Sequence, residues 1–506
     1  MNQKVRVRFA PSPTGPLHIG GVRTALFNYL FAKKHKGDFL LRIEDTDQTR
    51  YVPGAEEYIM ESLEWCGIKI DEGVRVGGPY SPYRQSERKE LYKKYVDQLV
   101  DNGDAYLAFD TPEELDKLRA EYESRGDTFT YNSQTRTSLR NALTLSNEEV
   151  KLMLDRGEHF VIRFRMPENM DVTENDIIRG QVTFNTDRLD DKVLFKSDGM
   201  PTYHLANVVD DHLMKITHVI RGEEWLSSMP LHVLLYEKLG WERPEFAHLP
   251  LILKPMGKGK LSKRDGDKMG FPVFSLQWTD PFTGELSSGY REGGYFPEAF
   301  VNMLAFLGWN PGTEQEIFSM DELIDAFDLE RVGKSGSKFD PEKTKWFNHQ
   351  YMLRKSVEEI SESFRIFLLQ KGIQAEKDFV TRVVGMVKER ATFIPDIWEQ
   401  GHYFFKSPET YDEQSVKKRW KEGVPEMMQQ IHDLLLGFDD KWEAPAIKEK
   451  FSAYVTEKEW GFGLIMNAYR ICIVGAAMGP DLFEICEMIG KEETLKRIQN
   501  GINNIH

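Results

Sequence analysis

The order of secondary-structure patterns near the start of the chain constrains its fold most. Residues 4–10 alternate polar residues with β-formers, and the breaker cluster 11–16 follows directly. An apolar helical stripe comes next, with members spaced at i, i+3, i+4, i+7 and i+8: Val22, Ala25, Leu26, Tyr29 and Leu30. Residues 39–43 form a strand pattern, and a second helix pattern follows Pro53 and Gly54. This order predicts an α/β fold built on a doubly wound parallel, Rossmann-like sheet.

The remainder of the chain divides into stretches of different pattern. At 506 residues the chain is too long for one core, and the usual domain size suggests roughly three to five domains. Over residues 103–199 polar helices mix with short strands such as 159–164, so we expect an α+β insertion that splits the sheet domain. The sheet pattern resumes with a helix over 203–211 and a strand over 216–221. From about Val301 onward helical periodicity dominates, which predicts an all-helical distal half.

The charge and the apolar content limit the possible partners. The formal net charge is −15 and the pI is near 5.4. Phosphate binding needs local positive charge, so this balance argues against a nucleic-acid partner unless a basic stripe lies on an acidic body. No apolar run is long enough to span a bilayer, and no signal core precedes the first strand pattern. We therefore expect a cytoplasmic protein without membrane association.

The turn between the first predicted strand and helix is one candidate site. It carries Pro11, Ser12, His18, Gly20 and Gly21 where an open α/β sheet binds ligands. Free N–H groups at the helix start favour a phosphate, and glycine lets an adenosine approach the backbone. The histidine can donate a hydrogen bond to a phosphate oxygen. Alone, these residues favour a glycine-rich turn with a helix-capping histidine, and the strand–turn–helix context makes the two interpretations about equal. Their spacing is neither G-x-G-x-x-G nor G-x-x-x-x-G-K-[ST], which disfavours a dehydrogenase and a P-loop NTPase.

A basic segment over residues 258–266 is the second candidate. Glycines flank it, so we expect a mobile loop, and Lys260 and Lys263 can reach phosphates as point charges. A solvated basic loop is the commoner meaning of such a charge run. The two segments together are much more specific than either alone.

These two segments carry a resemblance to a known family. His18-Ile19-Gly20-Gly21 resembles the HIGH signature of class I aminoacyl-tRNA synthetases, and Lys260-Leu261-Ser262-Lys263-Arg264 resembles their KMSKS signature. We name these runs the first and second signatures. Within the class, the chain resembles the bacterial glutamyl-tRNA synthetases over five further stretches: 8–15, 42–47, 80–88, 203–212 and 219–225. The resemblance covers essentially the whole chain, strongly to about residue 350 and weakly beyond.

The resemblance implies an ATP-dependent reaction in two steps. L-Glutamate is first activated to glutamyl-adenylate with release of pyrophosphate, and is then transferred to the 3′ end of tRNA(Glu). The implied catalytic residues are His18, Lys260 and Lys263, and the implied ATP site is Pro11, Ser12, His18, Gly20, Gly21, Glu224, Leu253, Lys260, Ser262 and Lys263. Mg²⁺ is expected to arrive with ATP. The expected partners are ATP, L-glutamate and tRNA(Glu), and a monomer is expected.

The implied glutamate pocket uses residue types that suit two carboxylates and an ammonium group. A guanidinium can bind a carboxylate through two hydrogen bonds, and a carboxylate can bind the amine. The positions that match the family are Arg8, Ala10, Ser12, Glu44, Tyr203, Asn207 and Arg221. Which arginine binds which carboxylate stays open. Without the resemblance, Arg8 would fit a surface charge at a strand end and Glu44 a helix-cap partner.

The resemblance also implies roles for the domains. They are 1–102 and 200–226 (two parts of the Rossmann-like catalytic domain), 103–199 (inserted acceptor-end-binding domain), 227–345 (stem-contact domain with the second signature), and 346–420 and 421–506 (helical anticodon-binding subdomains). The helical half would bind anticodon bases by stacking and hydrogen bonds. Arg390 falls where the family places an arginine that discriminates the glutamate anticodon from the glutamine anticodon. A surface helix arginine fits the same position.

The sequence departs from the family in two places. Some bacterial members carry a cysteine-rich zinc site in the insertion, but residues 106–109 have no cysteine nearby. Cys66, Cys472 and Cys486 form no C-x-x-C pair, so we expect reduced core thiols and no structural metal. Residues 269–295 form a longer stretch than usual after the second signature. Two roles stay open, packing over the signature loop to restrain its motion or decorating the surface, and surface decoration is the more general expectation.

Several alternatives remain at this point. A glutaminyl-tRNA synthetase shares the signatures, but its β-barrel anticodon domains disagree with a helical distal half. A short enzyme that glutamylates a modified base lacks that half, and a small adenylyltransferase needs neither it nor the glutamate pocket. A catalytically inactive tRNA-binding relative disagrees with the intact His18, Lys260 and Lys263. Whether tRNA(Gln) is also charged stays open.

Overall fold

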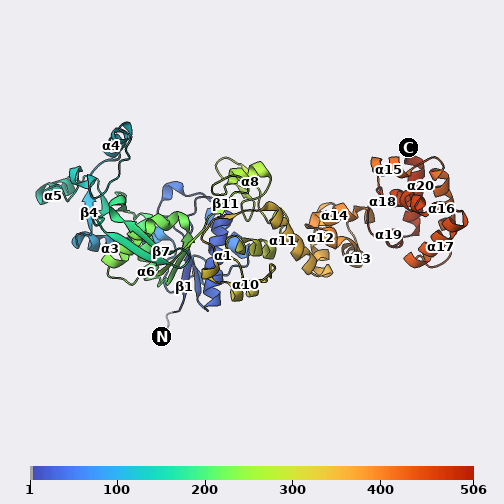
Figure 1. Cartoon of the computed structure of the whole chain (residues 1–506), viewed down its shortest axis with the longest axis horizontal. Coiled ribbons are helices and arrows are strands. Elements are labelled where there is room, and N and C mark those ends of the chain that lie inside the picture. Colours follow the sequence, from blue (N-terminus) through green and yellow to red (C-terminus); the bar gives the residue numbers. More distant parts are fainter. Residues whose placement is uncertain (1–3, 506) are drawn as a thin grey trace. The chain divides into compact units, whose positions relative to one another are not determined.

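The computed structural model describes residues 4–505 of the chain (Figure 1). The outermost residues of the first and last predicted domains, 1–3 and 506, lie outside the described residues. The chain divides into two compact units, Met1–Thr344 and Lys345–His506. Helix α11 (Pro341–Arg354) contains the point of division. The boundaries of the smaller predicted domains stay predictions.

Parallel strands form the centre of the first unit, as predicted. Strands β1 (Arg6–Phe9), β2 (Asp38–Leu41) and β3 (Glu72–Gly73) pair in that order, and all of them are parallel. Strand β9 (His218–Gly222) pairs in parallel with β10 (Glu245–Leu249). The backbone N–H of Thr217, just before β9, donates to the carbonyl of Arg6 at 2.9 Å and joins the two sets of strands.

Both faces of these strands are covered, which explains why β1 is buried along its whole length. Helix α1 (Ile19–Lys34) covers one face, where the ring of Tyr29 meets Phe39 of β2 at 5.8 Å. The next residue, Leu40, points to the other face, as the two-residue period of a strand requires. There it joins the apolar residues of α3 (Lys89–Asp101), α6 (Tyr203–Leu213) and α7 (Met229–Lys238).

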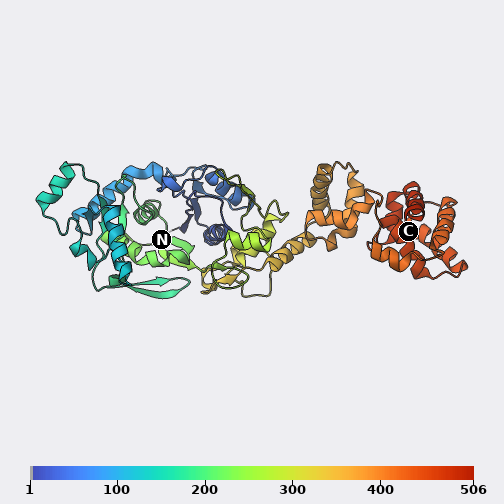
Figure 2. The ribbon, with the colours of Figure 1, turned by 90° about the horizontal axis from the view of Figure 1, so that it is seen from above.

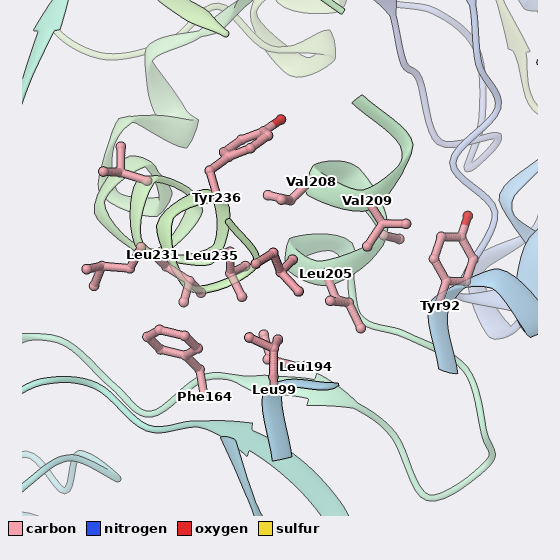
Figure 3. Packing of buried hydrophobic residues seen from close by; sticks show 14 of the residues in the cluster. Tyr92, Leu99, Phe164, Leu194, Leu205, Val208, Val209, Leu231, Leu235 and Tyr236 are labelled. Atoms are coloured by element: carbon pink, nitrogen blue, oxygen red, sulfur yellow. The ribbon is translucent and has the colours of Figure 1, made fainter. Parts of the chain in front are cut away.

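Figure 3 shows this second core from close by. Leu205, Val208 and Val209 of α6 face Leu231, Leu235 and Tyr236 of α7, and Tyr92 and Leu99 of α3 close one side. Phe164 and Leu194 reach the same core from strands of the inserted segment. The insertion is therefore anchored to the sheet domain by shared apolar burial.

The inserted segment has an antiparallel sheet of its own. Its strands are β4 (Ala105–Ala108), β5 (Val161–Phe164) and β8 (Val193–Phe195), and its longer helices are α4 (Pro112–Ser124) and α5 (Asn147–Asp155). Figures 1 and 2 place α4 and α5 at one end of the first unit, away from α8 and α10. The hairpin of β6 (Asp171–Asp176) and β7 (Gly180–Asn185) instead extends the central strands, because β6 pairs with β10 at Asp176 and Phe246.

Short elements complete the first unit. They are α2 (Ala55–Trp65), β11 (Ile252–Leu253), α8 (Lys263–Met269), β12 (Trp278–Thr279), β13 (Leu286–Ser287), α9 (Pro297–Ala305), α10 (Met320–Ala326) and β14 (Ser337–Lys338). Strand β11 pairs in parallel with β14, and β12 with β13 forms a hairpin inside the stretch 269–295.

The second unit is helical throughout residues 345–505, as predicted. After α11 come α12 (Val357–Gln370), α13 (Lys377–Val387), α14 (Ile394–Gly401), α15 (Glu413–Arg419), α16 (Val424–Leu436), α17 (Ala444–Glu457), α18 (Phe462–Val474), α19 (Leu482–Ile489) and α20 (Lys491–Asn504). Its core is apolar and includes Ile431, Phe451 and Tyr469. Across residues 4–505, the helices are all too short or too polar to cross a membrane.

Candidate functional site

A cavity of about 420 Å³ lies at the carboxyl ends of β1, β2 and β9, where a doubly wound sheet places its ligands. Both predicted subsites open into it. The predicted site residues that line it are Arg8, Ala10, Pro11, Ser12, His18, Gly20, Gly21, Glu44, Tyr203, Asn207, Arg221, Glu224 and Lys260. Leu253, Ser262 and Lys263 lie next to this lining but outside it, and Arg390 belongs to the second unit.

His18 caps the N-terminus of α1 and has a defined tautomer. Its Nδ1 accepts the backbone N–H of Gly20 at 3.3 Å, so the ring proton must be on Nε2. Nε2 is buried and has no hydrogen-bond partner among the described residues. Burial, followed by the charge of Lys260, lowers the pKa of His18 to about 4. A neutral ring thus holds an unused N–H donor beside the cavity.

Glycine suits residues 20 and 21 of the first signature for different physical reasons. A Cβ on Gly21 would lie 2.5 Å from Cδ1 of Leu17, so any larger residue there would force the Leu17 side chain to shift. A Cβ on Gly20 would have its nearest neighbour, Nδ1 of His18, at 3.7 Å. Glycine at residue 20 therefore leaves room on the cavity side, where a nucleotide can approach the backbone.

The second signature returns along β11 and reaches the same cavity. Lys260 forms a bridge with Leu253, and its Nζ lies 3.0 Å from Oε1 of Glu224, which also lines the cavity. Gly257 and Gly259 adopt positive φ values of 79° and 110°, a conformation that favours glycine in this turn. The predicted juxtaposition of two segments distant in sequence is therefore present for His18 and Lys260.

Ser262 and Lys263 begin α8. The backbone N–H and the hydroxyl of Ser262 donate to Oδ2 of Asp265 at 3.0 and 2.6 Å, which ties the start of this helix to its first turn. Nζ of Lys263 lies 2.7 Å from Oε1 of Glu285, in the turn that joins β12 to β13. This carboxylate pairs with the lysine outside the cavity lining.

The stretch 269–295 packs against the site, so its expected role as surface decoration is wrong for its first part. The carbonyl of Val273 accepts the backbone N–H of Ile19 at 2.9 Å, next to His18. The hydroxyl of Tyr58 donates to the carbonyl of Leu276 at 2.5 Å and accepts its N–H at 2.9 Å. The hairpin tip is open to solvent, with Phe282 71% exposed. Apolar residues in this stretch are buried because they fill the gap between α2 and the start of α1.

Arg8 lies in a buried ion-pair network at the amino-acid end of the cavity. Its Nε and Nη2 donate to the two carboxylate oxygens of Asp211 at 2.9 and 3.1 Å. Arg42 also donates to Asp211, at 2.7 Å, and to Oε1 of Glu44, at 2.9 Å. Nδ2 of Asn207 donates to the same Glu44 oxygen at 3.1 Å. These contacts fix Arg8 and Glu44 with one edge of each group toward the cavity.

Arg221 is held differently, without a carboxylate partner among the described residues. Nη1 donates to the hydroxyl of Tyr203 at 3.0 Å, and Nη2 donates to the carbonyl of Trp225 at 3.3 Å. The rings of Tyr203 and Trp225 lie 4.2 Å apart at the cavity wall. Arg221 itself is 5% exposed. A buried guanidinium in this position favours an anionic group of a ligand.

Some residues of this site gave no pattern that sequence reasoning could use. Asp211 and Arg42 stand inside stretches that match the family, but their mutual contact joins residues 169 positions apart. His248 is a lone histidine in an apolar strand, and its bond to Arg221 likewise depends on the fold. Only the parallel pairing of β9 and β10 could have placed the two residues side by side.

The described residues contain no group of three or more histidine, cysteine or acidic side chains suited to a metal ion. The three cysteines are buried, as predicted for core thiols. Tyr106, in the stretch 106–109, donates its hydroxyl to Asp191 at 2.6 Å.

Arg390 lies on the surface of the second unit, in a short turn after α13. Its charge acts on Tyr403, whose pKa is raised to about 12 by burial and lowered in part by Arg470 and Arg390. The hydroxyl of Tyr403 is buried without a hydrogen-bond partner among the described residues. An exposed guanidinium therefore lies close to a polar group with free hydrogen-bonding capacity.

Comparison with known proteins gives a consistent answer. Residues 4–346 match the family described as tRNA synthetases class I (E and Q), catalytic domain, and residues 355–502 match an anticodon binding domain. The chain is 58% identical to a glutamate–tRNA ligase of Christiangramia forsetii, over all of both chains. It is also 58% identical to one of Flavobacterium johnsoniae, over 99% of this chain and 100% of the relative. A crystal structure of a glutamate tRNA ligase from Elizabethkingia meningosepticum in complex with its amino acid is 56% identical over both full chains, with a TM-score of 0.97.

Proposed function

The chain belongs to the class I tRNA synthetases of the glutamate and glutamine group, as one of the glutamate–tRNA ligases, and we propose how its cavity performs that reaction. ATP and L-glutamate bind together in the cavity. The enzyme joins them as glutamyl-adenylate and then transfers glutamate to the 3′ end of tRNA(Glu). One observation carries the proposal: the free Nε2–H of His18 and the ammonium of Lys260 meet in the cavity that also holds Arg8 and Arg221.

In the first step, the α-carboxylate of glutamate attacks the α-phosphorus of ATP. A new P–O bond forms, and the bond to the leaving pyrophosphate breaks. The attacking oxygen is already ionised, so the site needs no strong base and acts by positioning and by stabilising phosphate charge. His18 donates Nε2–H to a phosphate oxygen, and Lys260 and Lys263 neutralise the departing pyrophosphate. Mg²⁺ enters bound to ATP, as part of the substrate.

The adenosine end lies over the start of α1 and against the second signature. Pro11, Ser12, Gly20 and Gly21 form the floor, and Glu224, Leu253 and Ser262 lie on the side of the second signature. Glu224 and Glu285 act as temporary partners of Lys260 and Lys263. Exposed ion pairs of this kind are worth at most about 1 kcal/mol, so a triphosphate displaces both carboxylates.

We assign the glutamate side chain to the arginine end of the cavity. Arg221, which has no carboxylate partner among the described residues, contacts one substrate carboxylate. Arg8 contributes Nη1, the guanidinium nitrogen that does not donate to Asp211. Glu44, with Asn207 beside it, accepts the substrate ammonium. Burial raises the pKa of Glu44, against the charges of Arg42 and Arg8, and an incoming ammonium group favours the ionised form. Ala10 and Ser12 line the first-strand side of the pocket, and Tyr203 lines the wall.

The second unit contacts the anticodon loop, and Arg390 discriminates the glutamate anticodon from the glutamine anticodon. The inserted domain binds the acceptor end. We further propose that the chain acts in the cytoplasm as a monomer and binds no zinc. The acidic net charge requires RNA contact through a limited set of basic side chains, so charging falls steeply with added salt.

Charging of purified tRNAs tests the proposal. The full chain is incubated with ATP and labelled glutamate or labelled glutamine, with tRNA(Glu) and with tRNA(Gln) in separate reactions. We expect glutamate on tRNA(Glu), dependent on ATP, and no glutamine on either tRNA. Glutamate on tRNA(Gln) as well would identify a non-discriminating enzyme, and glutamine on tRNA(Gln) alone would contradict the proposal in favour of a glutaminyl-tRNA synthetase.

A further inference from the structure

The hydrogen bonds of Arg221 define the tautomers of the residues behind it. A guanidinium can only donate, so each partner nitrogen must present a lone pair. Nε of Arg221 lies 3.0 Å from Nε2 of His248, and Nη1 lies 3.2 Å from Nδ1 of His232. Both histidines are therefore neutral acceptors toward Arg221. His232 has its proton on Nε2, which lies 3.2 Å from Nδ1 of His204.

Asp176 fixes the other side of His248. With Nε2 accepting from Arg221, the proton of His248 is on Nδ1 and is donated to Oδ2 of Asp176 at 2.6 Å. Oδ1 of Asp176 accepts the backbone N–H groups of Ile178 and Arg179 at 3.0 and 2.8 Å. Asp176 is 1% exposed and His248 is fully buried. Both hydrogen bonds of this series therefore have a single direction: Arg221 donates to His248, and His248 donates to Asp176.

The arrangement contrasts with that of the other cavity arginine. Arg8 forms two hydrogen bonds with the carboxylate of Asp211, which neutralises much of its charge directly. Arg221 is oriented by imidazole nitrogens, a hydroxyl and a carbonyl, and its nearest acid on this side, Asp176, lies behind a whole imidazole ring. A neutral acceptor fixes the direction of a guanidinium without cancelling its charge. Arg8 is therefore both oriented and largely neutralised by its partner, whereas Arg221 is oriented but keeps its charge.

We infer that His248 and Asp176 are positioning residues for Arg221, which fix its guanidinium toward the cavity through neutral acceptors and so leave its positive charge to the carboxylate of the amino-acid substrate. The inference rests on the proposed function, which places a substrate carboxylate on Arg221. It also gives β6, a strand of the inserted segment, a part in the amino-acid site, since Asp176 is its last residue.

The pKa shifts of His248 and His232 agree with these hydrogen-bond directions. Burial is the first cause that lowers the pKa of His248, and the hydrogen bond from Nδ1 to Asp176 opposes it. Burial also lowers the pKa of His232, with Arg221 and His204 as further causes. Protonation of either ring would place a donor against the Arg221 N–H groups. The neutral forms that the hydrogen bonds require are thus the forms that burial favours.

Two isosteric substitutions separate the roles. In Asp176→Asn, the amide oxygen stays with the backbone N–H groups of Ile178 and Arg179, so the amide NH₂ faces Nδ1 of His248 and also the backbone N–H of His248, which donates to Oδ2 at 3.0 Å in the unaltered chain. The ring proton then moves to Nε2, where it opposes Arg221. In His248→Gln, the side-chain oxygen can accept from Arg221 while the amide donates to Asp176. His248→Leu removes both functions at similar volume, and His212→Gln, a histidine stacked on Trp241 away from the cavity, is the matched control.

The readout is ATP–pyrophosphate exchange by the full chain with tRNA present, at varied glutamate and at varied ATP, together with thermal unfolding. We expect Asp176→Asn and His248→Leu to raise KM for glutamate about tenfold or more without changing KM for ATP, because each removes a hydrogen bond to a charged group. His248→Gln should stay within about threefold of wild type, since it keeps that bond. His212→Gln should match wild type.

Wild-type KM for glutamate in Asp176→Asn and His248→Leu would overturn the inference. Equal impairment in His248→Gln and His248→Leu would also overturn it, as would parallel losses for ATP and glutamate with reduced melting temperature, which indicate a purely structural role. Arg221→Ala distinguishes this failure from failure of the proposed function. If Arg221→Ala leaves KM for glutamate unchanged, the pocket assignment itself is wrong. If it raises KM while the Asp176 and His248 variants do not, only the positioning role is lost.

Discussion

Replacing Arg8 by alanine should affect binding and stability by separate routes, and the two can be measured apart. Arg8 is 3% exposed, and two of its nitrogens donate to Asp211, which is 1% exposed. Breaking a buried pair completely costs about 3–5 kcal/mol. Arg42 still donates to Asp211 at 2.7 Å, so about half of that, ~2 kcal/mol, is expected here. The catalytic unit should therefore still fold.

The activity loss should be larger than this stability loss can explain. A substrate contact to a charged group is worth about 1.5–3 kcal/mol, which corresponds to a fall of about tenfold to 150-fold in kcat/KM for glutamate. The assay is ATP–pyrophosphate exchange with tRNA present, at a temperature well below unfolding. Arg8→Ala should lose activity there while circular dichroism and the cooperative transition persist.

The double variant Arg8→Ala/Asp211→Asn is the control. Against burial, the charges of Arg8 and Arg42 hold the pKa of Asp211 below its usual value, so this carboxylate stabilises the fold at neutral pH and loses that effect on acidification. Neutralising residue 211 should restore much of the stability lost in Arg8→Ala but none of the glutamate activation. Recovery of activity in the double variant, or unchanged exchange in the single one, would refute the role of Arg8 in the pocket.

Further outcomes follow from the same geometry. Lys263→Ala should slow adenylation at least about tenfold with little change in KM for glutamate, and steady-state kinetics equal to wild type would remove the catalytic role of Lys263. Glu285→Gln should lower KM for ATP slightly. Arg390→Gln should narrow the preference for tRNA(Glu) over tRNA(Gln), and an unchanged charging ratio would make this residue a plain surface arginine. Burial lowers the pKa of His18 to about 4 in the folded chain, whereas an unfolded histidine has a pKa of about 6.5. Between these pH values the unfolded chain binds a proton that the folded chain does not, so the free energy of unfolding declines as the pH falls. His18→Asn should flatten part of that decline in denaturant midpoints, and an equally steep decline would contradict the buried neutral ring. Metal analysis of the purified chain should find no tightly bound zinc, and one zinc per chain would overturn that expectation.

The sequence predicts the fold class because the determining patterns are local. Alternation before the breaker cluster and the helical stripe from Val22 to Leu30 correspond to β1 and α1. The predicted helix over 203–211 and strand over 216–221 correspond to α6 and β9 within a few residues. Local propensity and burial agree at these positions, so no long-range information is needed.

What the sequence could not predict depends on contacts between distant segments. Asp176 and His248 are 72 positions apart, and neither stands in a motif, so their pairing required the strand order β6–β10–β9. The burial of residues 273–276 had the same cause, since their partners lie on α1 and α2. The signatures predicted the meeting of His18 and Lys260. They did not predict the carboxylates that pair with the two lysines, because Glu224 was expected only as a contact of ATP and Glu285 stands in no motif.

The most direct measurement compares the full chain with His18→Ala in ATP–pyrophosphate exchange with tRNA(Glu) present. The free imidazole N–H of His18 is proposed to donate to a phosphate oxygen during adenylation. Removal of one such donor should lower the rate at saturating glutamate and ATP by about 10²–10³, with KM for glutamate little changed. A rate equal to that of the unaltered chain would contradict the account, because the first signature would then be a helix cap and nothing more.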